Sequence, residues 1–311
     1  MNDKTREQIE AMKQPTFGIE IEGNNITREK AAKAVARFFG TGRSEYTARR
    51  NGYDSWSAWD AQGREWKFQK DVSIQGPDSQ KCEMVSPILR YEDMELLQGV
   101  VRTLRKAGMK SDYTRMAGVH VHISGEGHTP QTIRNLVNIM AAHESQLAKA
   151  IRIDRDRMAR YCRTVDPRFL KAINKKKPKT MSELEDLWYQ TQDADSCRTA
   201  HYNASRYHFA NLHSFFNGHG TIEFRCFQFD CPHDGKQNGM HAGQVKAFIQ
   251  LCLAINQLAK QVRTASPKPQ QTENEKYAMR CWMLRLGFIG DEFKTARDYY
   301  LNNMDGNSAW R

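Results

Sequence analysis

Apolar and polar side chains alternate in four short stretches, which this period-two pattern predicts to be β-strands with one buried face. In residues 17–23, apolar side chains alternate with Glu20 and Glu22. The same alternation recurs in residues 81–89, 118–124 and 221–227. If these four strands lie in one curved antiparallel sheet, their apolar faces pack beneath helices and their polar faces line a cavity.

The predicted polar faces carry side chains that are unusual for strands. They are Glu20 and Glu22 on the first, Glu83 on the second, His120 and His122 on the third, and Glu223 and Arg225 on the fourth. Carboxylates two residues apart on a strand repel one another unless a cation lies near them, and Glu is disfavoured in strands. Mostly oxygen ligands with a single imidazole suit Mg²⁺ or Mn²⁺ better than zinc. Each strand taken alone is also compatible with an ordinary solvated face.

Between these strands, periodicity of three to four residues predicts helices. A helix beginning after Thr27 and closing at Gly40 follows the first strand, and residues 91–107 form a helix that stops at Gly108. Further helices are predicted from Pro130, over residues 181–189 and over 245–262. Residues 41–65 are interpreted as a loop or irregular hairpin.

Residues 66–89 are predicted to form an antiparallel hairpin with its turn near Gly76. One arm would run from Trp66 to Ser73 and carry Asp71, and the other would carry Glu83. Asp71 is equally suited to capping the turn that follows it.

Composition limits the classes of protein that this chain represents. The 311 residues, 39% of them hydrophobic, suffice for one large domain or a domain with an appendage. There is no apolar run long enough to span a membrane, and the first residues lack the apolar core of a signal peptide. Seven cysteines without a Cys-x-x-Cys pair favour a reducing cytoplasm. Cys226, Cys231 and His233 lack a regularly spaced fourth ligand, so zinc is not expected there.

Positive charge is concentrated in one segment. Residues 149–179 contain 12 Lys/Arg against three Asp, so a charge of +9 out of the net +11 lies in a tenth of the chain. This segment favours a polyanionic partner such as nucleotide phosphates, nucleic acid or an acidic substrate. For any single one of these charges, a solvated helical face is a sufficient explanation.

Five motifs in a fixed order resemble the amidoligase family, which belongs to the glutamine synthetase-like and glutamate–cysteine ligase-like carboxylate–amine ligases. The motifs are Phe17-Gly-Ile-Glu-Ile-Glu22, Asp71-Val-Ser-Ile74, Cys82-Glu-Met-Val-Ser-Pro-Ile-Leu89, Gly118-Val-His-Val-His122 and Thr221-Ile-Glu-Phe-Arg225. The resemblance covers residues 17 to about 260 and is poor over 149–200.

The resemblance implies an α+β fold in which a strongly bent antiparallel sheet forms a funnel flanked by helices. We therefore expect a catalytic domain over residues 1–262 with a basic helical insertion at about 149–200. A linker and a helical C-terminal extension would occupy residues 263–311.

By the same resemblance, ATP and two or three Mg²⁺ would meet the substrates inside the funnel. The expected metal ligands are Glu20, Glu22, Glu83, His120 and Glu223, with His120 and Glu223 at the ion that activates the γ-phosphate. The residues expected to contact the nucleotide are Arg206, Arg225, Asn211 and Ser73. Arg225 would neutralise the phosphoryl oxygens, and Asp71 and Ser73 would position the substrate or amine, so Arg225, Asp71 and Glu22 are the expected catalytic residues. Arg206 also fits a surface arginine, and His122 fits either a substrate contact or a buried structural histidine.

The leading hypothesis is ATP-dependent formation of an amide or peptide bond through an acyl phosphate, on small-molecule or peptide substrates. A metal-dependent hydrolase that uses His120 and His122 is one alternative. Another is a nucleic-acid-binding protein on a degenerate ligase fold, in which residues 149–179 bind the nucleic acid. A hybrid, in which this segment delivers an acidic polymer to the ligase site, also stays open.

Overall fold

The computed structural model describes residues 3–48, 53–230 and 239–309. The chain forms two compact units, each made of separate pieces of the sequence. The sheet unit comprises Thr16–Val121 and Phe227–Lys246, and the helical unit comprises Met1–Pro15, His122–Cys226 and Ala247–Arg311. Strand β6 (Val119–Ser124) runs from the first unit into the second.

Eight strands are hydrogen-bonded in the order β2-β3-β4-β5-β1-β6-β8-β7. Their bounds are β1 Phe17–Gly23, β2 Ser44–Tyr46, β3 Trp56–Trp59, β4 Glu65–Gln69, β5 Cys82–Val85, β7 Ala210–Asn211 and β8 Thr221–Phe227, in addition to β6. The pairs β1/β5, β2/β3, β3/β4, β4/β5 and β7/β8 are all antiparallel. The predicted combination of helices with an antiparallel sheet is therefore confirmed, and the sheet is open.

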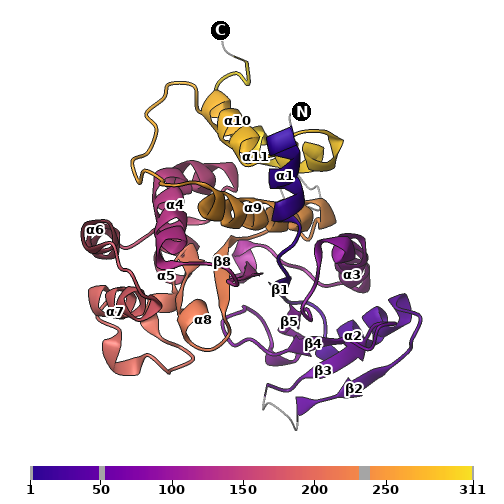
Figure 1. Ribbon diagram of the computed structural model, residues 1–311. Helices are drawn as coiled ribbons and strands as arrows, with labels where there is room; N and C mark the ends of the chain where they lie inside the picture. Colours follow the sequence, from indigo (N-terminus) through magenta and orange to yellow (C-terminus); the bar gives the residue numbers. More distant parts are fainter. Residues whose placement is uncertain (1–2, 49–52, 231–238, 310–311) are drawn as a thin grey trace. The chain divides into compact units, whose positions relative to one another are not determined.

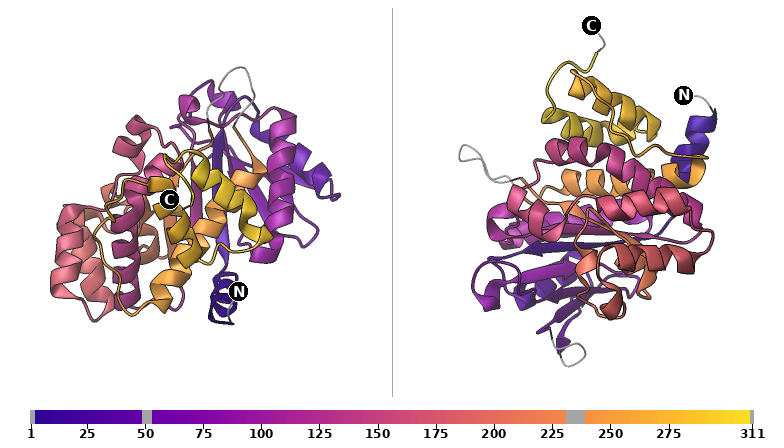
Figure 2. Two further views of the ribbon diagram at one scale, coloured as in Figure 1. Left: turned by 90° about the horizontal axis from the view of Figure 1, so that it is seen from above. Right: turned by 90° about the vertical axis from the view of Figure 1, so that its left-hand side faces the viewer.

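In the sheet unit, helices α2 (Arg28–Phe38) and α3 (Met94–Ala107) pack against each other, and α2 lies against β2, β3 and β4 (Figures 1 and 2). The side chains that form this core are Phe17, Ile19, Ile21, Trp66, Phe68 and Met84 from the strands, with Ala31, Ala32, Val35, Leu97, Val101 and Leu104 from the helices. Burying one such large side chain contributes about 1.5–3 kcal/mol. Because the apolar side chains of β1, β4 and β5 are buried on one face of the sheet, their polar side chains lie on the other face.

The predicted helix ends are present in the structure. The Thr27 hydroxyl accepts the Lys30 N–H and starts α2, and Gly108 ends α3 with φ +110°. Thr129 and Pro130 start α4 (Pro130–Ala150) as N-cap and first helical residue. These signals depend only on local chemistry, which is why the sequence locates them well.

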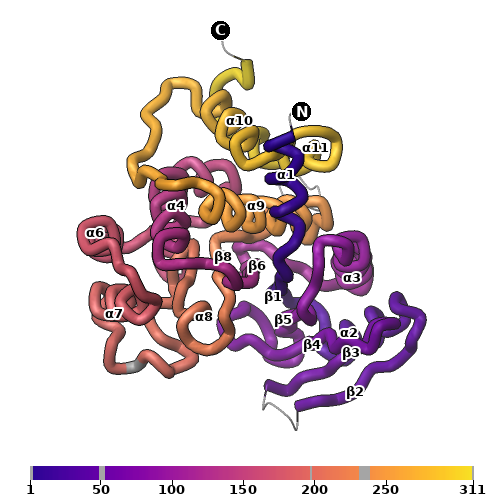
Figure 3. The backbone as a smooth tube through the Cα atoms, in the orientation of Figure 1, coloured from indigo at the N-terminus to yellow at the C-terminus, as the bar shows by residue number. Residues whose placement is uncertain are grey.

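The helical unit contains most of the helices. They are α1 Asp3–Met12, α4, α5 Arg155–Tyr161, α6 Pro167–Lys176, α7 Met181–Thr191, α8 His213–Phe216, α9 Ala242–Gln261 (from Ala247 onward), α10 Glu275–Arg285 and α11 Lys294–Asn302. The Asn135 amide on α4 donates to the carbonyls of Ala259 and Val262, and so ties α4 to the end of α9. Figure 3 shows the chain turning from α6 into α7, which pack together.

Two sequence-based boundaries differ from the structure. Strand β4 ends at Gln69 rather than continuing to Ser73, because the Asp71 carboxylate accepts hydrogen bonds from Ser73 and closes a turn there. Strand β5 ends at Val85 rather than continuing to Leu89. Within residues 41–65, β2 and β3 form a short hairpin, which was one of the two interpretations of this stretch. The predicted division into a catalytic domain and an extension at residue 262 stays a prediction. None of the helices within the described ranges is long and apolar enough to cross a membrane.

Candidate functional site

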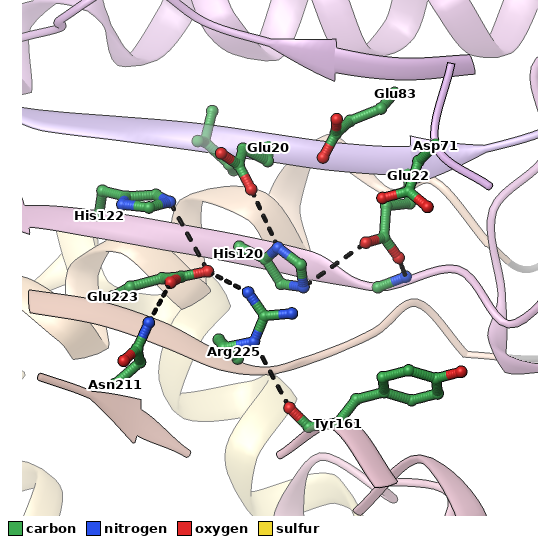
Figure 4. A network of polar contacts seen from close by, with 12 residues as sticks. Glu20, Glu22, Asp71, Glu83, His120, His122, Tyr161, Asn211, Glu223 and Arg225 are labelled. Atoms are coloured by element: carbon green, nitrogen blue, oxygen red, sulfur yellow. Dashed lines mark hydrogen bonds and ion pairs between the residues drawn. The ribbon is translucent and has the colours of Figure 1, made fainter. Parts of the chain in front are cut away.

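Four carboxylates and one imidazole of the sheet unit converge on the polar face of its strands (Figure 4). Glu20 and Glu22 come from β1, Glu83 from β5 and His120 from β6, while Asp71 comes from the segment after β4. Glu22 and Glu83 are directly paired across β1 and β5, which places their side chains on the same face. The alternation along three strands therefore builds this group, which we call the acidic cluster.

Hydrogen bonds fix part of the acidic cluster. His120 Nδ1 lies 3.0 Å from Glu20 Oε2, and His120 Nε2 lies 3.7 Å from Glu22 Oε1. The Gly118 N–H donates to Glu22 Oε2 at 2.6 Å. Glu22 and His120 are almost fully buried, whereas a quarter of the Glu20 side chain is exposed. The imidazole thus lies between two carboxylates of one strand.

Burial and neighbouring charges shift the pKa of Glu83, in the acidic cluster. Its side chain is buried and accepts a hydrogen bond of 2.8 Å from the Gln69 amide. Burial raises the pKa of Glu83 well above its usual value, and the neighbouring charges of Glu20, Glu22 and Asp71 raise it further. The hydrogen bond from Gln69 acts in the opposite direction but is the smaller effect. The acidic cluster therefore carries an excess of negative charge around Glu83.

The donor set fits a hard divalent cation. One ligand atom each from Glu20, Glu83 and His120 lie within 4.8 Å of one another, and the same holds for Glu22, Asp71 and Glu83. Neither Glu22 nor Glu83 forms an ion pair with a lysine or arginine in the parts of the chain that the structure describes. Carboxylate oxygens with a single imidazole are a donor set for Mg²⁺ or Mn²⁺. Glu83 belongs to both groups.

Asp71 lies in the acidic cluster. It was expected on a strand, but it follows the end of β4 instead. Its Oδ1 accepts from both the backbone N–H and the hydroxyl of Ser73, each at 2.6 Å. The turn-capping role is thus present in the structure. A carboxylate has a second oxygen, so this turn leaves Asp71 able to join Glu22 and Glu83 around a cation.

In the helical unit, a second group forms around Glu223 on β8 (Figure 4). Arg225 Nη1 donates to Glu223 Oε1, and the Asn211 amide on β7 donates to Glu223 Oε2 at 2.6 Å. His122 Nε2 lies 3.8 Å from Glu223 Oε1. The Thr221 hydroxyl lies 3.2 Å from His122 Nδ1. The structure therefore brings the predicted residues Glu223, Arg225 and Asn211 together, in a group that we call the Glu223 cluster.

Arg225 is buried and held from several directions. Its Nε donates to the Tyr161 carbonyl at 3.4 Å, and its guanidinium carbon lies 5.8 Å from the centre of the Tyr207 ring. Arg157, also buried, donates to the Arg225 carbonyl at 3.1 Å. A guanidinium fixed in this way is pre-organised to stabilise an anion without reorganising.

Arg206 lies near the same tyrosine. It belongs to a short 3₁₀ turn (Ala204–Arg206), and its guanidinium carbon lies 5.5 Å from the Tyr202 ring centre and 6.0 Å from that of Tyr207. Its Nη1 donates to the His201 carbonyl, while its buried Nε has no hydrogen-bond partner among the described residues. Arg206 is therefore partly buried rather than fully exposed. Its contact with a nucleotide stays a prediction.

Sequence reasoning missed two contributors to these clusters. Gln69 donates to Glu83. Alternation along β4 could have identified Gln69, because its side chain lies on the opposite face of the strand from the buried Trp66 and Phe68. Tyr207 follows Arg206 in sequence but has no periodic pattern around it, so no signal indicated its place beside Arg225. Cys226 is buried, and Cys231 and His233 lie outside the described residues.

The basic segment is largely exposed. Of its 12 Lys/Arg between residues 149 and 179, all of them in described parts of the chain, 11 are exposed and Arg157 is buried. Some of the exposed charges are already paired: Lys149 with Glu275 and Asp305, and Arg168 with Asp193. Polyanion binding by this segment stays a prediction.

Comparison with known proteins identifies the family. A family model described as "Putative amidoligase enzyme" matches residues 13–256. No curated protein matches the chain. Among solved structures, the chain is similar to a bifunctional glutathione synthetase from Pasteurella multocida, with 12% identity and a TM-score of 0.45. The match covers 97% of this chain but 48% of the synthetase chain, so this protein spans about half the length of that structure. Because the family model covers most of the chain, the protein belongs to the amidoligase family.

Proposed function

We propose that this protein is an ATP- and Mg²⁺-dependent carboxylate–amine ligase that releases ADP and forms an amide or peptide bond. The observation that carries the proposal is the acidic cluster: Glu83 is buried near Glu20, Glu22 and Asp71, and burial together with these negative charges raises its pKa. A divalent cation bound there would offset the repulsion among these carboxylates. Membership of the amidoligase family supports the same chemistry.

In this proposal the acidic cluster holds Mg²⁺ or Mn²⁺ through Glu20, Glu22, Glu83 and His120, and Glu223 is a metal ligand within its own cluster. The cation would neutralise phosphate oxygens and reduce repulsion between ATP and the substrate carboxylate. The sharing of Glu83 between two groups of ligands is consistent with two neighbouring ions. The funnel-shaped, glutamine synthetase-like arrangement is part of this proposal.

The Glu223 cluster would act on the transferring phosphoryl group. The substrate carboxylate attacks the γ-phosphorus, the bond to ADP breaks, and an acyl phosphate forms. Arg225 would stabilise the phosphoryl oxygens, and Arg206 and Ser73 would contact the nucleotide. For Asn211 the structure suggests an indirect role, since its amide donates to Glu223 and orients that carboxylate.

The second step would form the C–N bond. The amine attacks the acyl carbon, phosphate leaves, and the amine loses a proton. Asp71 and Ser73 would position the substrate or the amine, and Arg225 would stabilise the oxyanion of the tetrahedral intermediate. Strand β6 carries His120 of the acidic cluster and His122 of the Glu223 cluster only two residues apart in the sequence, which supports their acting in one reaction.

The test is a screen for amine-stimulated ADP release with Mg²⁺, using amino acids, polyamines, peptides and modified nucleotides. Glu22→Gln and Glu223→Gln should abolish ADP release while the circular dichroism spectrum is unchanged. Glu45→Gln, an exposed glutamate on β2, is the matched control and should be fully active. Wild-type turnover in either cluster variant would contradict the proposal. Tightly bound zinc without ATP binding would instead favour a hydrolase.

The exposed basic segment supports a second, narrower proposal, that the carboxylate or amine is presented on an acidic polymer or nucleic acid. The supporting observation is the exposure of 11 of its 12 basic side chains. Binding of polyglutamate or single-stranded RNA should then weaken steeply with salt. Equal binding by a variant in which Lys175, Lys176 and Lys177 are replaced by glutamine would contradict it.

A further inference from the structure

The segment between β4 and β5 supplies Asp71 and leads directly into Glu83. It has no regular strand, and hydrogen bonds within the segment and from Asn24 hold it in place. Lys81 Nζ donates to the Val72 carbonyl at 3.3 Å, and the Gln75 carbonyl accepts from the Asn24 amide at 2.9 Å. The position of Asp71 relative to Glu83 therefore depends on how firmly this segment is anchored.

Arg28 provides the anchor with the most hydrogen bonds. It is the first residue of α2 and is only 7% exposed. Its Nη1 donates to the carbonyls of Asp78 and Lys81, at 2.8 and 2.6 Å. Its Nε donates to the Asp54 carbonyl at 2.8 Å, and its Nη2 pairs with the Asp54 carboxylate. One guanidinium thus joins helix α2, Asp54 two residues before β3, and the end of the β4–β5 segment.

The Lys81 carbonyl lies two residues before Glu83, at the point where the chain enters β5. Asp78 lies in the same segment as Asp71. Fixing both carbonyls to one rigid group limits the movement of the segment at its Glu83 end. We propose that Arg28 is a positioning residue that holds Asp71 and Glu83 at the separation needed to bind a divalent cation. This inference rests on the proposed function, because it assumes that the acidic cluster binds metal.

The geometry requires arginine. The guanidinium is planar and presents donors from three nitrogens in a fixed fork, whereas a lysine ammonium is a single compact donor group on a flexible stem. Lysine at position 28 retains the charge but cannot reach Asp54, Asp78 and Lys81 together. Loss of a residue that orients metal ligands typically weakens metal binding 10–100-fold. Arg28→Lys should therefore weaken metal binding by about tenfold or more.

The chain offers a matched control in the same unit. Arg64 also uses all three of its nitrogens, donating to Asp60 at 2.8 Å and to Asp93 at 2.9 and 3.0 Å. Within the described residues, these side-chain hydrogen bonds reach neither the acidic cluster nor the β4–β5 segment. Arg64→Lys should therefore reduce stability in a similar way without changing the metal site.

The experiment measures Mn²⁺ affinity by electron paramagnetic resonance in wild type, Arg28→Lys and Arg64→Lys, with the thermal midpoint of each. We expect both variants to melt earlier and only Arg28→Lys to bind Mn²⁺ more weakly. Wild-type affinity in Arg28→Lys, or equal weakening in Arg64→Lys, would overturn the inference while leaving the proposed function standing. Absence of Mn²⁺ binding by wild type would overturn both.

Two further measurements cover the case in which Arg28→Lys does not fold. Asp54→Asn removes only the ion pair at Nη2 and keeps the backbone contacts, so it should weaken Mn²⁺ binding by a few-fold. Hydrogen exchange of the amides in residues 71–83 should be faster in Asp54→Asn than in wild type, and unchanged in Arg64→Lys. Unchanged exchange and affinity in Asp54→Asn would overturn the inference.

Discussion

Replacing Glu83 by glutamine should have opposite effects on stability with and without metal. Glutamine has the same shape and keeps an acceptor for the Gln69 amide, so it removes the charge of Glu83 with little change in packing. Without metal, that charge is unfavourable, because burial and the neighbours Glu20, Glu22 and Asp71 all raise its pKa. With metal, the same charge is a ligand.

The size of both effects can be estimated. Two unit charges separated by the 4.8 Å within which these ligand atoms lie repel by about 3 kcal/mol at an effective dielectric constant of about 20. Partial protonation of Glu83 relieves part of this cost, so the metal-free variant should be about 1–2 kcal/mol more stable than wild type. Wild type should gain about 2.7 kcal/mol at a metal concentration about 100 times the Kd. The variant should lose most of that gain.

The assay is thermal unfolding of wild type and Glu83→Gln, first in EDTA and then in saturating Mg²⁺. We expect the variant to melt at a higher temperature than wild type in EDTA and at a lower temperature in Mg²⁺. Glu45→Gln, which removes an exposed charge on β2, should follow wild type in both conditions.

Two results would refute this reasoning. If Glu83→Gln is less stable than wild type in EDTA, the charge of Glu83 is not repelled as the structure indicates. If Mg²⁺ raises the melting temperature of wild type and variant equally, the acidic cluster is not where Mg²⁺ binds.

Two further predictions concern stability. Burial raises the pKa of Glu144, on α4, to about 7, so the folded state holds a proton that the unfolded state loses between about pH 4.5 and 7. Stability should therefore fall as pH rises through this range, and Glu144→Gln should be more stable than wild type by up to about 3 kcal/mol above pH 7 but not near pH 4.5 in urea titrations. A gain that is the same at both pH values would contradict this assignment. At Gly23, which ends β1, an added Cβ would lie 2.7 Å from the Lys110 carbonyl oxygen, so Gly23→Ala should cost about 1–3 kcal/mol in the same assay, and an unchanged urea midpoint would show that the backbone can move aside.

The sequence predicted strands more reliably where one face is apolar throughout. Strands β1 and β8 have the predicted bounds, because Phe17, Ile19 and Ile21, and likewise Ile222 and Phe224, must be buried. The acidic cluster followed from the same alternation, since the residues between the buried ones share the opposite face. Local periodicity thus identified the acidic and imidazole side chains on β1, β5, β6 and β8, although it missed Gln69 on β4.

Residues held by turns and by distant contacts could not be found in this way. Asp71 closes its own turn with Ser73, which was one of the two roles that the sequence left open, and strand periodicity could not choose between them. Arg28 lies at the start of a helix and bonds to carbonyls about 25 to 50 residues further along, which no local pattern encodes. The hairpin of β2 and β3 has only three paired positions, so the sequence left this stretch open as a loop or an irregular hairpin.

The most direct test of the central claim is isothermal titration of the protein with ATP, in the presence of Mg²⁺ and again in EDTA, for wild type and Glu83→Gln. If the acidic cluster holds the cation that binds ATP, wild type should bind ATP only with Mg²⁺, and Glu83→Gln should lose most of that affinity. ATP binding that is unaffected by EDTA or by Glu83→Gln, or the absence of ATP binding by wild type, would contradict the account.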